Sequence, residues 1–320
     1  MPRQRIVVIV ALCAAAAASA VVGVTLIEMR GQTTTVPGAV TAPRPGMPQL
    51  ELGFGLADNV EARTLAQAQR LYSEGRLTQA AALFGRYQSP AAQIGLAFAR
   101  WSDGDGVQAL QQLAGRYPRS ALVALHLGWA YFWAGRDADA VVAWERTISL
   151  QPDSPYAVDA GYNLYAKKGS PPGLPPIVLA LPLPGSLTPR KVEALRSAAS
   201  APSARAKLLY GWILWSLERP LSAEREFAAA ARLAPHDAVA RTAAAVGRFS
   251  WKDPTRAFAK LGPLTAVFPH SPAVEFHLGV LLLYVAERQK AARQLRAAIA
   301  DGPHTAYAKP ARQLLAGIAK

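Results

Sequence analysis

The chain has 320 residues, of which 51% are apolar and 18% are charged, and its formal net charge is +14 at pH 7. This composition excludes an intrinsically disordered polar chain and suffices for a large buried core. The only cysteine, Cys13, excludes an intramolecular disulfide, a CxxC redox pair and a zinc site built from cysteines. The positive charge favours acidic partners or anionic envelopes, but an Arg-rich soluble surface has the same sign.

The first predicted element is an apolar segment at the amino terminus. Residues 6–27 contain no charged residue, and a helix of that length, rising about 1.5 Å per residue, crosses a hydrocarbon core of roughly 30 Å. Small residues at 18–20 resemble a signal-peptide cleavage site, so a secretion signal is the alternative. Because the apolar run continues past them, we expect an uncleaved transmembrane anchor over residues 1–30. Basic residues before it predict a single-pass protein with a cytoplasmic amino terminus and an extracytoplasmic body.

A linker and two helical regions follow the anchor. Residues 31–58 are rich in proline and threonine and predict an extended spacer. Residues 59–154 and 204–320 contain alanine-rich apolar runs at helical spacing, interrupted by Gly-Arg, Glu-Arg or proline. This pattern predicts short antiparallel helices, with a final capping helix at the carboxyl terminus.

Residues 155–203 separate the two helical regions. We expect one helix, then a proline-rich insertion at residues 171–185, PPGLPPIVLALPLPG, and then a second helix that begins near Thr188. The insertion cannot be helical because of its prolines. It is predicted to pack on the helices as a structural insert, and the alternative is that it docks a partner or the groove of its own chain.

A period of 34 residues organises the helical regions. Pro235, Pro269 and Pro303 follow each other at this spacing, and so do Pro118 and Pro152. Small residues recur at two fixed places of the period: Gly128, Gly211, Gly279, Ala140, Ala223, Ala257 and Ala291. We expect them where two helices cross, because a larger side chain would push the backbones apart.

The unit 121–154 carries the fullest pattern, with Leu127, Gly128, Tyr131, Ala140, Trp144 and Pro152 in register. Here the chain resembles the tetratricopeptide repeat (TPR) family, whose unit contains L-G-x2-Y, then A-x3-F, then P. The resemblance implies an all-α solenoid of TPR-like helical hairpins, wound as a right-handed superhelix, after the transmembrane helix. It also suggests a membrane-anchored bacterial member of the family.

In the resembled family, fixed places of each first helix line a concave groove that binds an extended peptide or a partner helix. Carried over to this sequence, these places are occupied by Leu125, Trp129, Phe132, Trp133, Leu208, Trp212, Trp215, Phe249, Phe276 and Tyr284. Such an aromatic and aliphatic groove suits apolar or proline-rich segments. The alternative is that these side chains pack against neighbouring helices.

No catalytic or cofactor motif occurs in the sequence. The histidines form no HExxH, and there is no phosphate-binding loop, GxGxxG or GxSxG. We therefore expect no enzyme, no cofactor and no metal, but a membrane-tethered scaffold for protein–protein interactions on the extracytoplasmic side. Nucleic acid is not an expected partner, and self-association stays open. The alternative is a basic surface module that binds a polyanion or a cell-envelope glycan, and salt would weaken that binding steeply.

Overall fold

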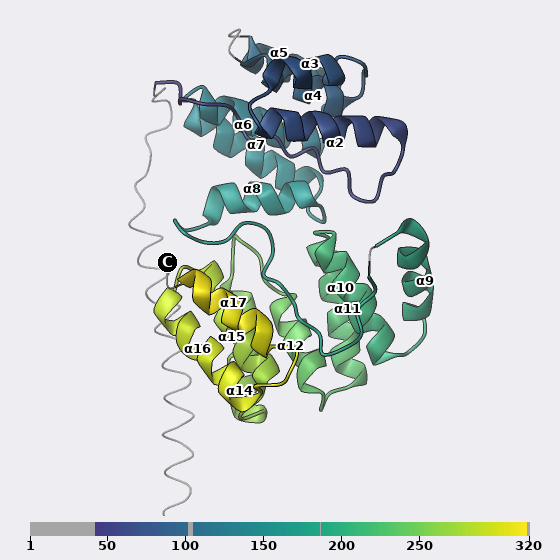
Figure 1. The fold of residues 1–320 in the computed structure, drawn as a ribbon, viewed down its shortest axis with the longest axis vertical. Coiled ribbons are helices and arrows are strands. Elements are labelled where there is room, and N and C mark those ends of the chain that lie inside the picture. Colours follow the sequence, from purple (N-terminus) through teal and green to yellow (C-terminus); the bar gives the residue numbers. More distant parts are fainter. Residues whose placement is uncertain (1–41, 102–104, 186, 319–320) are drawn as a thin grey trace, which may run out of the picture. The chain divides into compact units, whose positions relative to one another are not determined.

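The computed structural model describes residues 42–101, 105–185 and 187–318. The predicted membrane segment, residues 6–27, lies outside this part of the chain. Among the helices that the structure describes, none is long and apolar enough to cross a membrane. The described residues are helical or irregular, without a β-strand, and divide into two compact units, 42–165 and 166–318 (Figure 1).

The N-terminal unit consists of helical hairpins. The pairs α2 with α3, α4 with α5 and α6 with α7 pack along their lengths, and α8 packs against α6 and α7. The helices are α2 (Val60–Ser73), α3 (Leu77–Phe84), α4 (Pro90–Ala99), α5 (Gly106–Arg116), α6 (Ala121–Trp133), α7 (Asp137–Leu150) and α8 (Pro155–Tyr165).

The C-terminal unit is built in the same way. After α9, which packs on α10, the hairpins pair α10 with α11, α12 with α13 and α15 with α16, and α17 covers α16. The helices are α9 (Pro189–Ala199), α10 (Ala204–Ser216), α11 (Pro220–Leu233), α12 (Ala238–Val246), α13 (Thr255–Leu261), α14 (Leu264–Val267), α15 (Pro272–Tyr284), α16 (Arg288–Asp301) and α17 (Ala308–Ile318). The expected all-α hairpin architecture is confirmed for the described residues.

Glycines set the distance between the two helices of a hairpin. A Cβ atom on Gly128 would lie 2.4 Å from the indole nitrogen of Trp144, which faces it from α7. Gly211 meets Phe227 in the same way, at 2.8 Å. A real side chain at either position would force the helices apart. The predicted role at the helix crossings is confirmed for Gly128 and Gly211.

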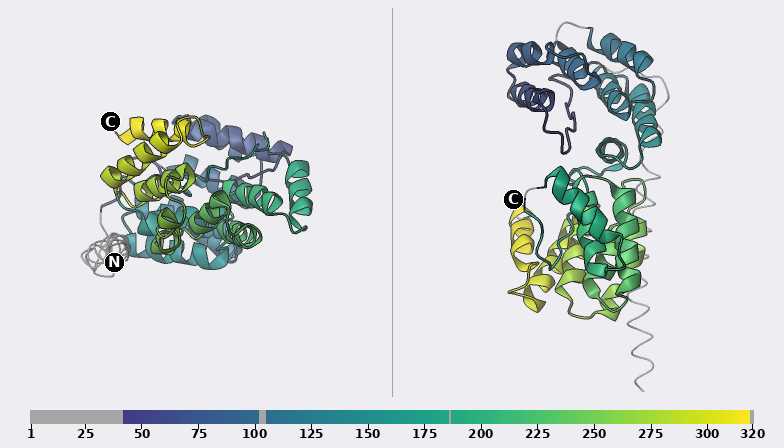
Figure 2. Two further views of the ribbon diagram at one scale, coloured as in Figure 1. Left: turned by 90° about the horizontal axis from the view of Figure 1, so that it is seen from below. Right: turned by 90° about the vertical axis from the view of Figure 1, so that its right-hand side faces the viewer.

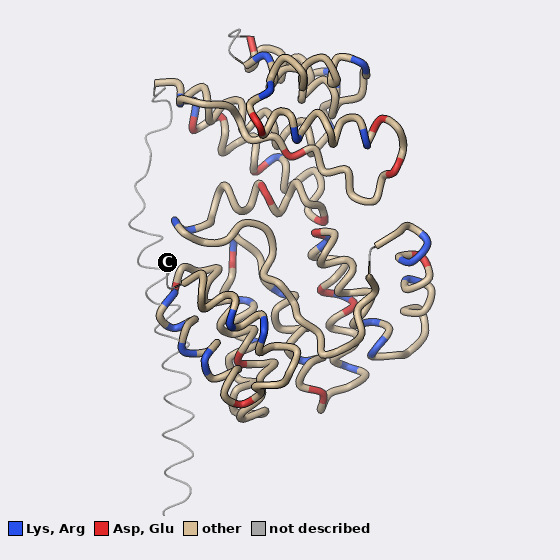
Figure 3. The backbone as a smooth tube through the Cα atoms, viewed as in Figure 1, with Lys and Arg blue, Asp and Glu red and all other residues tan. Residues whose placement is uncertain are grey.

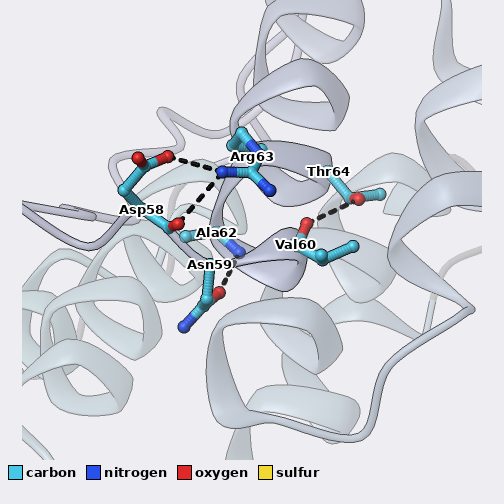
Figure 4. A network of polar contacts seen from close by, with 6 residues as sticks. All are labelled: Asp58, Asn59, Val60, Ala62, Arg63 and Thr64. Carbon is cyan, nitrogen blue, oxygen red and sulfur yellow. Dashed lines mark hydrogen bonds and ion pairs between the residues drawn. The ribbon is translucent and has the colours of Figure 1, made fainter.

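Polar side chains fix the point where extended chain turns into the first helix of the N-terminal unit (Figure 4). The side-chain oxygen of Asn59 accepts a hydrogen bond from the amide of Ala62 at 2.8 Å, which caps α2. One turn on, the Arg63 guanidinium donates to the carbonyl and to the carboxylate of Asp58, at 3.0 and 2.7 Å. These contacts lie where the extended segment before α2 ends and the helix begins.

Candidate functional site: two proline-rich straps in the grooves

Each unit has an extended, proline-rich segment that lies against its own helices. We call residues 44–53 strap 1 and residues 171–180 strap 2. The right-hand view of Figure 2 shows strap 1, in purple, between α2 and the later helices of its unit. Strap 1 lies in the region that the sequence predicts to be a spacer, and strap 2 lies in the predicted insertion. Both pack on helices because alternate apolar side chains find buried positions there.

The two straps share a sequence pattern. Residues 45–52 are PGMPQLEL, and residues 172–179 are PGLPPIVL. In both, the second proline and the sixth and eighth residues are buried, namely Leu50 and Leu52 in strap 1 and Ile177 and Leu179 in strap 2, while the residues between them are exposed or half-buried. The glycines adopt positive φ angles, +95° at Gly46 and +73° at Gly173, which only glycine tolerates easily. The same chain path is therefore encoded twice.

Arg44 holds the start of strap 1. Its guanidinium donates to both carboxylate oxygens of Asp137, at 2.8 and 3.0 Å, and to the carbonyl of Phe132. The same group lies 3.7 Å from the centre of the Phe132 ring. The Arg44 amide donates to the Trp133 carbonyl at 2.8 Å. The strap thus enters across the end of α6, where carbonyl groups of the last turn accept hydrogen bonds from outside the helix.

Side chains from α2 and α8 bind the backbone of strap 1. The Tyr72 hydroxyl donates to the Pro48 carbonyl at 2.6 Å. The Leu52 amide donates to the side chain of Gln69 at 3.2 Å, and the Leu52 carbonyl accepts from the Tyr156 hydroxyl at 3.4 Å. Because these bonds involve main-chain groups, they fix the path of the segment without specifying its side chains.

Two tryptophans on α10 bind strap 2 in a comparable way. The indole of Trp215 donates to the Pro175 carbonyl at 2.8 Å, and that of Trp212 donates to the Ile177 carbonyl at 3.0 Å. Pro175 follows the glycine of strap 2 at the same spacing as Pro48 follows that of strap 1, and each is bound by an aromatic side chain on the first hairpin of its unit.

Tyr284 holds the start of strap 2. Its hydroxyl, which has one proton, donates to the Leu174 carbonyl at 2.8 Å and lies 3.2 Å from the Pro172 carbonyl. Its own carbonyl accepts from the Ser170 hydroxyl at 2.8 Å. Burial raises the pKa of the Tyr284 hydroxyl well above its usual range, so it remains a donor.

A buried histidine binds the middle of each strap. The Glu51 amide donates to Nε2 of His126 at 3.2 Å, and the Val178 amide donates to Nε2 of His277 at 3.0 Å. Nδ1 of each ring lies within 2.8 Å of a carbonyl one turn earlier on the same helix, Leu122 or Ala273. An Nδ1 proton donated to that carbonyl leaves Nε2 free to accept, so both rings must be neutral.

Burial lowers the pKa of His126 and of His277 to about 4, against 6.5 for an exposed histidine. The neutral form that the strap requires is therefore the stable form at neutral pH. Protonation would turn Nε2 into a donor that faces a backbone N–H, and the hydrogen bond to the strap would be lost.

The two units place equivalent residues at equivalent points of the strap. His126, Trp133 and Tyr156 have counterparts at the same distance further along the chain, namely His277, Tyr284 and Tyr307. Tyr156 faces Gly53 at the end of strap 1, and Tyr307 lies beside the Ala180 backbone at the end of strap 2. The strap and the side chains that bind it form one module that occurs twice.

The structure separates the sequence-predicted groove residues into two groups. Phe132, Trp133, Trp212, Trp215 and Tyr284 contact a strap through the interactions described above. The remaining residues are buried in the core: Leu125, Trp129, Leu208, Phe249 and Phe276. Trp129, for example, packs edge to face on the rings of Phe132, Trp133 and Trp144.

Sequence reasoning missed the histidines, together with Tyr72, Gln69 and Arg44. His126 and His277 share one place of the repeat, and nothing in the sequence alone marks that place as a contact to another segment. The signal was the recurrence of Pro-Gly-x-Pro ahead of each set of hairpins.

Strap 2 leaves a hollow beside it, of about 410 Å³, on the side of α10. Trp212, Leu183 and Glu218 are among the residues that line it. Leu183 is 40% exposed and so presents apolar surface next to the strap.

Comparison with known proteins identifies the repeat. The family model for the tetratricopeptide repeat matches residues 123–154, which correspond to α6, α7 and the turn after them. The predicted TPR resemblance is confirmed for this unit. No curated protein matches the chain.

The solved structures that resemble this chain have low sequence identity to it and low TM-scores. Yeast Tom70 is 14% identical over 80% of this chain and 48% of its own, with a TM-score of 0.33. The TPR2AB domain of yeast Sti1, in complex with pHSP90, is 14% identical over 81% of this chain and 98% of its own, with a TM-score of 0.30. A thermophilic TPR protein of Thermus thermophilus is 15% identical over 81% of this chain and 98% of its own, with a TM-score of 0.28. The chain spans about half the length of Tom70.

Proposed function

We propose that this protein is a scaffold for protein–protein interactions whose two grooves bind extended, apolar or proline-rich segments. One observation carries the proposal: each unit holds such a segment of its own chain. Side chains on the helices of the unit form hydrogen bonds with the main-chain groups of that segment. TPR-like hairpins with a matched repeat at residues 123–154 support the same function class. The protein is not an enzyme in this proposal, and it uses no cofactor.

The location belongs to the proposal as well. Residues 6–27 tether the chain to a membrane, with the amino terminus in the cytoplasm and the two units on the other side, where they organise envelope proteins. The charge pattern around the apolar segment supports this orientation.

In-cell proximity labelling from a tag fused after Lys320, combined with protease treatment of intact cells, tests both parts. The expected result is a protease-accessible tag and a small recurring set of envelope proteins as neighbours. A protected tag would overturn the orientation. Random labelling in proportion to protein abundance would overturn the scaffold function.

The basic surface favours the second candidate, binding to a polyanion or an envelope glycan. Arg288, Arg293 and Arg296 lie on α16, and Figure 3 shows basic residues along this helix. Replacement of the three arginines by glutamine would remove such binding and would leave binding in the grooves unchanged. If binding to envelope material falls steeply between low and physiological salt, the second candidate replaces the first.

A further inference from the structure

The groove of each unit selects for a pattern rather than for one sequence. The buried positions of the straps are filled by Pro48, Leu50 and Leu52 and, in the other unit, by a proline, an isoleucine and a leucine. The intervening positions differ in chemistry, with glutamine and glutamate in strap 1 against proline and valine in strap 2. Two unrelated sets of intervening residues thus fit grooves that share a histidine acceptor and an aromatic donor to the carbonyl of the second proline.

The contacts themselves explain this tolerance. The histidine, tyrosine and tryptophan side chains bind amides and carbonyls of the strap, and these groups are present in any extended segment. The proline positions stiffen the segment in an extended form, so that little conformational entropy is lost on binding. A chain with prolines at these places and apolar residues at the alternate positions satisfies both requirements.

We propose that each groove is a receptor for an external segment of the pattern Pro-Gly-apolar-Pro-x-apolar-x-apolar, and that the strap is its built-in competitor. This inference rests on the proposed function and names the ligand class of the same grooves. A tethered strap competes at an effective concentration in the millimolar range, so the intact protein binds an external segment only weakly.

The structure offers a place to remove the tether without removing the strap. Residues 55–59 connect strap 1 to α2 and are exposed except for the half-buried Leu56. A recognition sequence for a site-specific protease, inserted between Leu56 and Ala57 of the full-length chain in mild detergent, can be cut after folding. The strap then remains bound only through its contacts, and an added peptide can replace it.

The probe is a fluorescent peptide with the sequence of residues 43–54. The expected result is that the cut protein keeps its helical circular dichroism and binds the probe saturably, roughly 100-fold more tightly than the uncut protein. A cut protein that loses helicity, or that stays folded and never exchanges its strap for the probe, would overturn the proposal, because the strap would then be a permanent part of the core.

Variant peptides test the pattern. A Glu51→Pro peptide lacks the amide that donates to His126 and should bind about tenfold more weakly. A Glu51→Ala peptide keeps the amide and should bind like the parent, because Glu51 is exposed. A peptide with the sequence of residues 170–181 should compete at the same groove. Failure of this last peptide would show that the grooves do not share a ligand class.

The peptide-exchange experiment and the proximity-labelling experiment can fail independently of each other. A scaffold that uses another surface would keep its recurring neighbours in cells and would fail the exchange experiment. A groove that exchanges strap peptides, in a protein without recurring neighbours, would retain the receptor chemistry and lose the scaffold function.

Discussion

His126 and His277 couple the straps to proton concentration. In the folded protein their pKa is lowered from 6.5 to about 4, so between these pH values the unfolded chain binds more protons than the folded one. The free energy of unfolding therefore falls as the pH drops from about 6.5 to about 4, and the histidine contribution is complete above 6.5. For one histidine the loss is roughly 3 kcal/mol.

Glu275 has the opposite effect on the free energy of unfolding as the pH drops, because burial and Asp301 raise its pKa to about 7.

A comparison of wild type with His126→Gln isolates one histidine. Glutamine offers an oxygen that can accept the Glu51 amide and does not titrate. We expect urea unfolding of the N-terminal unit to show a smaller loss of stability between about pH 6.5 and about pH 4.5 in the variant than in wild type, since the effects of other groups cancel in the difference. Equal losses in the two proteins would mean that His126 is not a neutral acceptor in the fold.

Substitutions of Trp215 test whether its side chain contributes to the stability of the fold. It is 4% exposed, packs against Phe227 and donates to the Pro175 carbonyl. We expect Trp215→Ala to lower the free energy of unfolding by about 3–5 kcal/mol, and Trp215→Phe by about 1–3 kcal/mol, because phenylalanine keeps ring packing and loses the indole donor. Urea titrations measure both. A neutral Trp215→Ala variant would show that the side chain contributes little to the fold.

At the scale of helices, the hairpin crossing makes a sharp prediction. Gly128→Ala should destabilise the protein by about 1–3 kcal/mol, since the new methyl group would lie 2.4 Å from the rigid indole of Trp144. The matched control is Gly115→Ala on α5, where no atom lies within 4 Å of the added Cβ. This change should stabilise by up to about 1 kcal/mol, because alanine favours the helix. Thermal melts of the two variants should shift in opposite directions, and a shift in the same direction would contradict the crossing geometry.

The elements also show what sequence can and cannot predict. Helix positions followed from periodic apolar residues and prolines; α9, for instance, begins at Pro189 with Thr188 as its cap. Spacing likewise placed Gly128 where two helices cross, but it did not identify Trp144 as the side chain that faces it. The packing of the proline-rich insertion, which contains strap 2, on the helices was predicted. Strap 1 was expected to be part of a spacer, because an extended segment has no periodicity of its own and its partners lie far away in sequence. Glu51 lies in a proline-rich segment and His126 in a helical repeat, so nothing in the sequence indicates the hydrogen bond that joins them in the folded chain.

At the scale of the whole molecule, the duplicated module predicts that each unit folds alone. Fragments 35–165 and 166–320 should each give a helical spectrum and a cooperative thermal transition. Fragment 54–165, which lacks strap 1, should melt at a lower temperature than fragment 35–165, because Leu50 and Leu52 no longer cover the core. Circular dichroism checks all three. An unfolded 35–165 fragment would refute the independence of the units, and equal melting temperatures with and without the strap would refute its part in the core.

The attachment of strap 1 at Arg44 has a mechanical consequence. The chain ahead of Arg44 connects directly to the clamp formed by Asp137 and the carbonyl of Phe132. Tension applied to that chain is therefore borne first by the clamp and then by the hydrogen bonds of the strap one after another, in the order in which the strap follows them. Such sequential loading ruptures bonds singly and requires far less force than shearing them together. A pull on the amino-terminal side would thus peel the strap from its groove while the hairpins stayed folded.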